Sequence, residues 1–392
     1  MTLEEVYADA ETSFGAEQYD DALRAYASIV EVEPSFLPAR KRVGDTLLAM
    51  DEVEAAKSVY RAVAWRYVLQ GHPLLGLAVA KRLVDLDPAY EDLVHIIAEL
   101  YSAASDRVAD IPSLPLPSLA DSSMAPAEID IEAEDWARRV AERAAETDQS
   151  EAAPTWLPAI PLFSALTESA FTKVLTSLQL RRFVEGEEIV VEGDDGDALF
   201  IVAEGHVNIT RWVDGRVHIM AQLGHGAVFG EMALIRRVPR SATAVAVGDV
   251  EIFELTRADL EQHADELESV RRALRAFTRS RLLANLAATS PLFVDLGPED
   301  RRQLLAEFLA QQVGAGDILL EEGGPGRGLF LIVSGEFDVR TASGAIGRLS
   351  AGEIFGEMSL LHDSAAMASV LADTDGEVLV LPKKSFWDVL RK

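Results

Sequence analysis

The stretch FGEMALIRRVPRSAT, residues 229–243, decides how the second half of the chain is interpreted. Gly230 allows the backbone to approach a ligand closely, and the six residues after it favour a short helix. The first amides of such a helix have no partner within it and can bind an anion. Glu231, at the start of the helix, can accept hydrogen bonds from hydroxyls, while Arg240 presents a planar fork to phosphate oxygens. Together these groups suit a compact phosphorylated sugar.

A similar stretch recurs near the C-terminus as part of a longer internal repeat. Phe-Gly-Glu-Met at 229–232 returns at 355–358, and Pro-Leu-Phe at 161–163 returns at 291–293. Each copy opens with a helical pattern and continues with short strands of alternating apolar residues, separated by Gly or Asp-Gly turns. This pattern is typical of antiparallel sandwiches and barrels. We therefore expect two antiparallel β-roll domains of the jelly-roll kind, with flanking helices, at residues 158–286 and 287–392.

The first copy resembles the cyclic nucleotide-binding domain family, because residues 229–243 are similar to its phosphate-binding cassette. The family pattern is Phe-Gly-Glu-aliphatic-Ala-Leu, followed after a variable stretch by Pro-Arg, any residue, Ala, and Thr or Val. The chain matches this pattern at Phe229, Gly230, Glu231, Met232, Ala233, Leu234, Pro239, Arg240, Ala242 and Thr243. The signature is long and specific, so we expect the first sandwich to carry an intact cassette.

The resemblance implies a role for each part of the cassette. Glu231 would bind the ribose 2′-hydroxyl and Arg240 would pair with the cyclic phosphate, while backbone amides complete the phosphate site. Ser241 would add a hydroxyl contact, and a serine there leaves the base ambiguous, with a weak preference for cAMP over cGMP. A helix over about 265–284 would close over the base as a lid. The predicted ligand-binding residues are Phe229, Gly230, Glu231, Met232, Ala233, Arg240, Ser241 and Ala242.

The second copy departs from the family pattern at the position of the arginine. It reads FGEMSLLHDSAAMAS, which keeps Glu357 but replaces Pro-Arg by Ala-Ala at 365–366. Removing one partner of a desolvated charge pair costs roughly 2–5 kcal/mol. We also expect no lid helix after Trp387, and His362 is the side chain that could partly replace the missing charge. The second domain should therefore bind cyclic nucleotide weakly or not at all. Its degenerate site comprises Gly356, Glu357, Met358 and Ala366.

A different, helical repeat occupies the N-terminal part of the chain. Its pattern recurs after 34 residues, so that Tyr19, Ala22 and Tyr26 return as Val53, Ala56 and Tyr60. The period resembles the tetratricopeptide repeat, and a generic helical bundle is the alternative. We expect helical repeats over 1–107, ending in a helix at about 89–107. A Pro-rich linker with a short acidic amphipathic helix should follow over 108–157.

The composition excludes several classes of function. With 65 acidic and 36 basic residues the net charge is −29, which disfavours binding to nucleic acid or to an anionic membrane. There is no cysteine, so disulfides, cysteine-ligated zinc and cysteine nucleophiles are excluded, and a reducing cytoplasm fits. No apolar run reaches the roughly 18 residues of a membrane span. The seven histidines form no metal-binding motif.

These observations favour a non-enzymatic cytoplasmic receptor for a cyclic nucleotide, cAMP more than cGMP. Its first sandwich would bind the ligand and couple it to a protein partner through the helical repeats. We expect no catalytic residue, metal or resident cofactor, and the sequence leaves a homo-oligomer open. The alternative is a scaffold protein that has kept the fold but no longer senses a ligand, and an enzyme is the third and weakest hypothesis.

Overall fold

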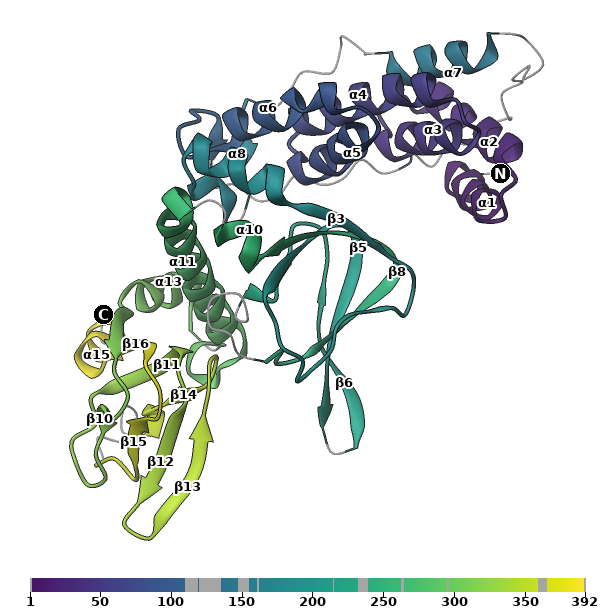
Figure 1. Cartoon of the computed structure of the whole chain (residues 1–392). Helices are drawn as coiled ribbons and strands as arrows, with labels where there is room; N and C mark the ends of the chain where they lie inside the picture. The colour runs from purple at the N-terminus through teal and green to yellow at the C-terminus, as the bar shows by residue number, and fades with distance from the viewer. Residues whose placement is uncertain are drawn as a thin grey trace. The chain divides into compact units, whose positions relative to one another are not determined.

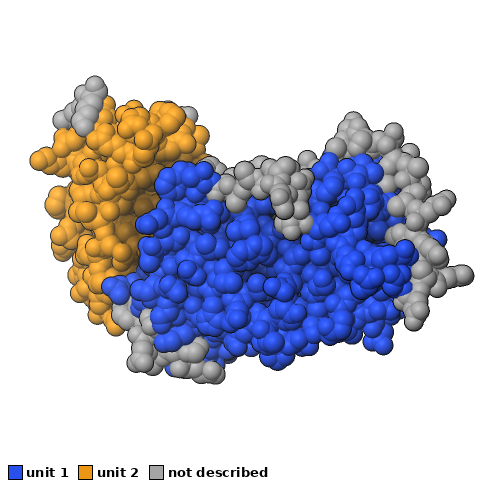
Figure 2. Space-filling view, turned by 90° about the horizontal axis from the view of Figure 1, so that it is seen from above, with its two compact units in different colours: residues 1–273 blue, residues 274–392 orange. Residues whose placement is uncertain are grey.

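The computed structural model describes residues 2–109, 119, 135–146, 155–160, 162–213, 215–231, 239–261, 264–294, 296–358 and 365–390. The chain divides into two compact units, Met1–Ala273 and Leu274–Lys392, which Figure 2 shows in different colours. The first unit contains the helical N-terminal part and the first sandwich, and the second unit contains the second sandwich. The multidomain fold expected from the sequence, helices followed by two antiparallel β domains, is confirmed.

The N-terminal part is an array of helices in which consecutive helices pack against each other (Figure 1). Its members are α1 (Leu3–Gly15), α2 (Tyr19–Val32), α3 (Leu37–Ala49), α4 (Val53–Leu69), α5 (Pro73–Leu86) and α6 (Asp92–Tyr101). Tyr26 and Tyr60, the tyrosines of the repeat pattern, are fully buried, as a core role requires. Their hydroxyls donate to Oε1 of Glu11 at 2.6 Å and to Oδ1 of Asp45 at 2.7 Å, so each buried hydroxyl has a partner.

The last helix of the array is shorter than the span of 89–107 expected from the sequence. Asp87 caps a 3₁₀ turn, Pro88–Tyr90, by accepting a hydrogen bond from the amide of Ala89 at 3.0 Å. This turn separates α5 from α6, and α6 ends at Tyr101. The physical reason is that Pro88 cannot continue α5, and the capped turn delays the next helix by one turn.

The two ends of the segment between the array and the first sandwich are joined by a short pair of parallel strands. Strand β1 (Val108–Ala109) pairs in parallel with β2 (Leu157–Pro158). Between them, α7 (Trp136–Ala145) packs against α2, α3 and α4. Arg40 of α3 donates to the carbonyls of Ala144 and Glu146, each at 2.7 Å, and thereby satisfies two carbonyls at the end of α7.

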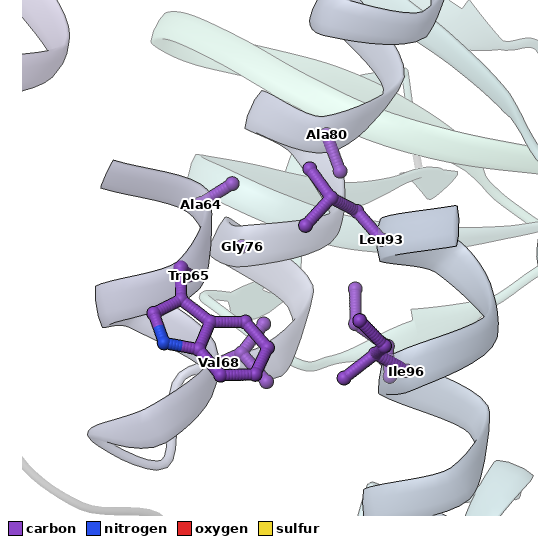
Figure 3. Close-up of a pocket in the computed structure, with 8 residues that line it drawn as sticks. Ala64, Trp65, Val68, Gly76, Ala80, Leu93 and Ile96 are labelled. Carbon is purple, nitrogen blue, oxygen red and sulfur yellow. The ribbon is translucent and has the colours of Figure 1, made fainter. Parts of the chain in front are cut away.

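A close helix crossing occurs where α4 and α5 meet at Gly76. A Cβ atom at Gly76 would lie 2.6 Å from Cγ2 of Val68 and 2.9 Å from the carbonyl oxygen of Ala64, so a side chain does not fit there without movement. Next to this crossing, α4, α5 and α6 enclose a shallow apolar pocket (Figure 3). It is lined by Ala64, Trp65, Val68, Gly76, Ala80, Leu93, Ile96 and Ile97.

The first sandwich is built around two long antiparallel strands. It follows α8 (Glu168–Ser177) and comprises β3 (Gln179–Phe183), β4 (Glu188–Val190), β5 (Ala198–Val213), β6 (Arg216–Leu223), β7 (Val228–Phe229) and β8 (Thr243–Thr256). The strand order is β3-β8-β5-β6, with β4 on β8 and β7 on β5. Strands β5 and β8 pair from one end of the domain to the other, with a register shift on each side of Glu204.

The second sandwich repeats this plan in two four-stranded sheets. Its strands are β9 (Leu309–Val313), β10 (Ile318–Leu320), β11 (Gly328–Ser334), β12 (Phe337–Thr341), β13 (Gly344–Leu349), β14 (Ile354–Phe355), β15 (Ser369–Ala372) and β16 (Gly376–Pro382). The strand orders are β10-β15-β12-β13 and β14-β11-β16-β9. Helices α12 (Pro291–Val294) and α13 (Pro298–Ala306) precede these strands, and α15 (Lys383–Leu390) follows them.

The boundary expected between the two sandwich domains does not coincide with the end of a helix. Strand β8 leads into α10 (Arg257–Glu261), and α11 (Ala264–Thr289) then runs for 26 residues. The expected boundary at 286/287 lies inside α11, and the two compact units divide earlier in the same helix, at 273/274. Within the described ranges, no helix combines the length and the apolar character that a bilayer crossing requires.

Candidate functional site

The start of the cassette is fixed by two stacked phenylalanines. Phe229 of β7 pairs with Phe200 of β5 in the ladder, and their rings stack with centroids 5.2 Å apart. Both side chains are buried, so they anchor β7 in the domain core. Gly230 follows with a φ of +76°, a left-handed conformation that favours glycine. The chain therefore leaves β7 in a sharp turn directed towards Arg240.

Arg240 is turned into the sandwich and away from solvent. It is 8% exposed, and its Nη1 donates to the carbonyl of Ala198 at 2.9 Å and to that of Gly230 at 3.1 Å. The guanidinium carbon lies 5.3 Å from the ring centroid of Phe200, a cation–π contact. The arginine that the sequence singles out is thus held in a defined position beside the turn at Gly230.

The electrostatics of this position favour an anion. Burial lowers the pKa of Arg240, and the carboxylates of Asp197, Glu254 and Glu231 partly oppose that effect. Arginine stays protonated in proteins, so the site holds a buried positive charge. A buried charge is costly without compensation, and Nη1 of Arg240 donates to two neutral backbone carbonyls. An anionic group placed here would supply a full opposite charge.

Gly230 is required for this arrangement. A Cβ atom at position 230 would lie 2.6 Å from Nη1 of Arg240 and 3.1 Å from the carbonyl oxygen of Ala198. Any side chain there would push the guanidinium away from its two carbonyl acceptors. The glycine of the cassette therefore serves the arginine as well as the turn.

The remaining cassette residues fall into two groups. Glu231 is buried, at 6% exposed, directly after Gly230, while Ser241 is exposed and Ala242 is half-buried beside Arg240. Met232 and Ala233 lie outside the described residues, as does the rest of the short helix expected after Glu231. The structure thus brings the turn, Glu231 and Arg240 together at one place in the first sandwich.

Several residues that position Arg240 were not identified as site residues from the sequence. The amide of Arg240 donates to the carbonyl of Asp194 at 2.7 Å, and the amide of Gly193 donates to the carbonyl of Arg240 at 2.8 Å. The carbonyl of Ala198 and the ring of Phe200 complete the group. In the internal repeat, Gly193 and Phe200 recur as Gly323 and Phe330, and this recurrence was the available signal for them.

The second sandwich has the same backbone around position 366 but not the same side chain. The amide of Ala366 donates to the carbonyl of Gly324 at 2.9 Å, and the amide of Gly323 donates to the carbonyl of Ala366 at 2.8 Å. Gly356 has a φ of +88°, as its counterpart Gly230 has +76°. The rings of Phe330 and Phe355 stack with centroids 4.6 Å apart. A buried methyl group at Ala366 therefore stands where the first sandwich has the Arg240 guanidinium.

The structure describes some, but not all, of the other residues expected at the second site. Glu357 is half-buried and Met358 is 42% exposed. His362, the expected substitute for the missing charge, lies outside the described residues. The lid expected over 265–284 falls within α11, in which the two compact units divide at 273/274. Among the described residues, no group of histidines and carboxylates is arranged to hold a metal ion.

Comparison with known proteins decides what the two sandwiches are. The family model described as "Cyclic nucleotide-binding domain" matches the chain twice, over residues 180–266 and over residues 310–392. These two segments are cyclic nucleotide-binding domains. The first contains the complete cassette described above, and the second contains the copy with Ala366.

The cyclic nucleotide-binding domains are homologous to regulatory subunits of cAMP-dependent protein kinase. That of Yarrowia lipolytica is 34% identical over 233 residues, which cover 58% of this chain and 58% of the relative. That of Eremothecium gossypii is 33% identical over 232 residues, covering 58% of this chain and 48% of the relative. The chain thus spans about half the length of the curated relatives it matches.

Solved structures also match the part of the chain that contains these domains. The regulatory domain of Toxoplasma gondii PKA with cAMP is 25% identical, covering 58% of this chain and 87% of that one, with a TM-score of 0.28. The N-terminal domain of a transcriptional regulator from Streptomyces coelicolor is 32% identical, covering 33% and 92%, with a TM-score of 0.30.

Proposed function

We propose that the chain is a non-enzymatic cAMP receptor whose first cyclic nucleotide-binding domain holds the ligand. The observation that carries this proposal is the buried guanidinium of Arg240 beside the turn at Gly230. A cyclic phosphate there would give the cation a bidentate anionic partner. Glu231, buried next to the turn, would accept the ribose 2′-hydroxyl. The proposed ligand contacts are those of Phe229, Gly230, Glu231, Met232, Ala233, Arg240, Ser241 and Ala242.

The choice of cAMP over cGMP rests on the relatives. Those cited above are named as regulatory subunits of cAMP-dependent protein kinase, and one matched structure is described as containing cAMP. Ser241 does not decide between the two bases. A direct comparison of the two ligands is therefore part of the test.

The second domain is proposed to bind cyclic nucleotide weakly or not at all. Its backbone around Ala366 repeats that around Arg240, so the loop can form without the arginine. The methyl group of Ala366 offers no charge to a phosphate. The loss of one partner from a desolvated charge pair, roughly 2–5 kcal/mol, corresponds to about 30-fold to several-thousand-fold in affinity.

The output is proposed to be a protein partner bound through the helical array. Helical repeats commonly bind partners on one face of the stack, and the period of this array resembles the tetratricopeptide repeat. The array belongs to the same compact unit as the first domain. The matched relatives are regulatory subunits by name, so regulation of a partner in the cytoplasm suits the composition. A scaffold without a ligand is the alternative.

Calorimetric titration of the intact protein with cAMP and with cGMP tests the proposal. We expect one site per chain with tighter binding of cAMP, and an affinity at least tenfold lower in Arg240→Ala. Arg216→Ala removes an exposed arginine of the same sandwich and should bind as the wild type does. Two equal sites would refute the asymmetry between the domains. If the protein is folded but binds neither nucleotide, the receptor proposal is wrong and the scaffold alternative remains.

A further inference from the structure

Four charged residues, three of them largely withdrawn from solvent, join the helical array to the first cyclic nucleotide-binding domain within one compact unit. Lys41 of α3 and Arg82 of α5 contact Glu204 of β5 and Glu251 of β8. We call these four residues the docking cluster. Lys41 is 6% exposed and Glu251 is 8% exposed, although lysine and glutamate are almost never buried unless they are paired.

The domain side of the docking cluster contains two like charges in an unfavourable position. Glu204 and Glu251 are direct partners in the antiparallel ladder of β5 and β8, so their side chains project to the same face of the sheet. Like charges directly opposite each other destabilise a sheet. Arg182 of β3 lies 3.1 Å from Oε1 of Glu251 and compensates only part of this charge. The domain therefore presents a site that requires further cations.

The array side supplies those cations from two different helices. Nζ of Lys41 contacts Glu204 and lies 3.4 Å from Oε2 of Glu251. The guanidinium of Arg82 contacts Glu251 with one nitrogen and Asp45 of α3 with another. The carboxylate of Asp45 also accepts the hydroxyl of Tyr60 at 2.7 Å. Arg82 is thus held by Asp45 of the array while it reaches the domain, and Lys41 pairs with the two glutamates of the domain.

The charges balance without any external ion. The cations of Lys41, Arg82 and Arg182 face the anions of Glu204, Glu251 and Asp45, and Arg42, which also lies 3.3 Å from Asp45, is matched by Glu11. Burial raises the pKa of Glu251, but Lys41, Arg82 and Arg182 outweigh burial and hold that pKa below its usual range. A buried ion pair adds little net stability, because desolvation offsets the attraction, and its best-attested use is to fix how two elements fit together.

We propose that the face of the array formed by α3 and α5 is an interaction surface occupied by the chain's own first domain, held there by the docking cluster. A partner that uses this face must therefore displace the domain, which makes the contact autoinhibitory. The contact also includes the packing of α6 against α8 and a hydrogen bond from Nζ of Lys81 to the carbonyl of Thr176 at 2.8 Å, so opening must release these together with the ion pairs. The docking stands on the contacts alone, and its link to a ligand rests on the proposed function.

The link to the ligand follows from the two strands that carry the glutamates. Strand β5 begins at Ala198, whose carbonyl accepts from Arg240, and reaches Glu204 six residues later. Strand β8 begins at Thr243, three residues after Arg240, and reaches Glu251 in its second half. A ligand at Arg240 thus acts on the same two strands that hold the array. Coupling between two sites is reciprocal, so breaking the docking cluster should change the affinity for cAMP.

Zero-length crosslinking with a carbodiimide tests the docking in the intact, dilute protein. We expect an amide between Lys41 and Glu204, whose side chain is 41% exposed and open to the reagent, in the monomer fraction by mass spectrometry. Lys57 and Asp87, 2.7 Å apart within the array, serve as an internal control. Recovery of the control amide without the Lys41–Glu204 amide would overturn the docking.

A second measurement asks whether the charges hold the domain in place. The chain has no cysteine, so spin labels can be placed at Gln18→Cys and Arg216→Cys, both exposed. Pulsed electron resonance should give one narrow distance distribution in the otherwise unchanged chain, and a broad one in Glu204→Gln/Glu251→Gln. A narrow distribution in both would show that the docking cluster is not what holds the domain.

Calorimetry on the same pair of proteins separates this inference from the proposed function. We expect the affinity for cAMP to differ at least threefold between the wild type and Glu204→Gln/Glu251→Gln. Equal affinities would overturn the coupling while leaving the cAMP receptor intact. Failure of the wild type to bind cAMP, together with a positive crosslink, would instead overturn the proposed function and leave the docking.

Discussion

Gly230 has two roles: it adopts a left-handed backbone conformation, and its lack of a side chain leaves space for Arg240. Substitution by alanine, compared with a matched control, should show how much each role contributes. Gly248 is a matched control, because it lies in the same sandwich with a φ of +69° and has nothing within 4 Å of its would-be Cβ. Both variants force a non-glycine residue into the left-handed region, at roughly 1–2 kcal/mol. Only Gly230→Ala also places a Cβ 2.6 Å from Nη1 of Arg240.

The additional cost of Gly230→Ala follows from the bonds that Arg240 must give up. If the guanidinium moves away, it loses its hydrogen bonds to the carbonyls of Ala198 and Gly230, and a hydrogen bond to a charged group contributes roughly 1.5–3 kcal/mol. We expect urea denaturation to give a loss of about 1–2 kcal/mol for Gly248→Ala and, because two such bonds are lost in addition, about 4–8 kcal/mol for Gly230→Ala.

Calorimetric titration with cAMP then provides the decisive comparison between the two variants. Gly248→Ala should bind as the wild type does, because strain at that position does not reach the guanidinium. Gly230→Ala should bind at least tenfold more weakly, which is about 1.4 kcal/mol. Equal affinities for cAMP in the two variants, whether both retained or both reduced, would contradict the role assigned to the contact between Gly230 and Arg240.

Three further predictions concern other parts of the chain. Ala366→Arg should add a second, weaker cAMP site by calorimetry, whereas Ala365→Arg, at the exposed neighbouring position, should add none. Gly76→Ala, with its Cβ 2.6 Å from Val68, should lower stability by about 1–3 kcal/mol in thermal unfolding, and Gly15→Ala, with open space around it, should not. Because the pKa of Glu251 is lowered in the folded state, its contribution is present above roughly pH 4.3 and is lost as the pH falls further. Glu251→Gln should therefore flatten the acid limb of the unfolding free energy.

The cassette could be proposed from the sequence because its residues are close together in the chain. Phe229, Gly230 and Arg240 lie within one short stretch whose pattern carries the turn, the helix start and the cation. The contacts that orient Arg240 come from Ala198 and Phe200, about forty residues earlier. One is a backbone carbonyl, which has no sequence signature, and only the strand register brings it to the guanidinium.

The docking cluster could not be predicted from the sequence for a different reason. Glu204 and Glu251 are single charges in strands, a pattern that normally indicates a solvent-exposed face, and Lys41 and Arg82 look like ordinary surface residues of amphipathic helices. Their pairing depends on how the array packs against the sheet, which no local pattern encodes. Helix ends were likewise approximate, since Asp87 and Pro88 end α5 and delay α6 through a capped turn.

The paired backbone bonds at positions 240 and 366 have a consequence for how ligand affinity can change in this chain. Each loop is tied to a preceding glycine turn by the same reciprocal amide–carbonyl bonds, whether the residue is arginine or alanine. The shape of the loop is therefore independent of the group that would recognise a ligand. A tandem protein built in this way can switch one of its two receptors off, or back on, by exchanging a single side chain while the domain that carries it stays folded.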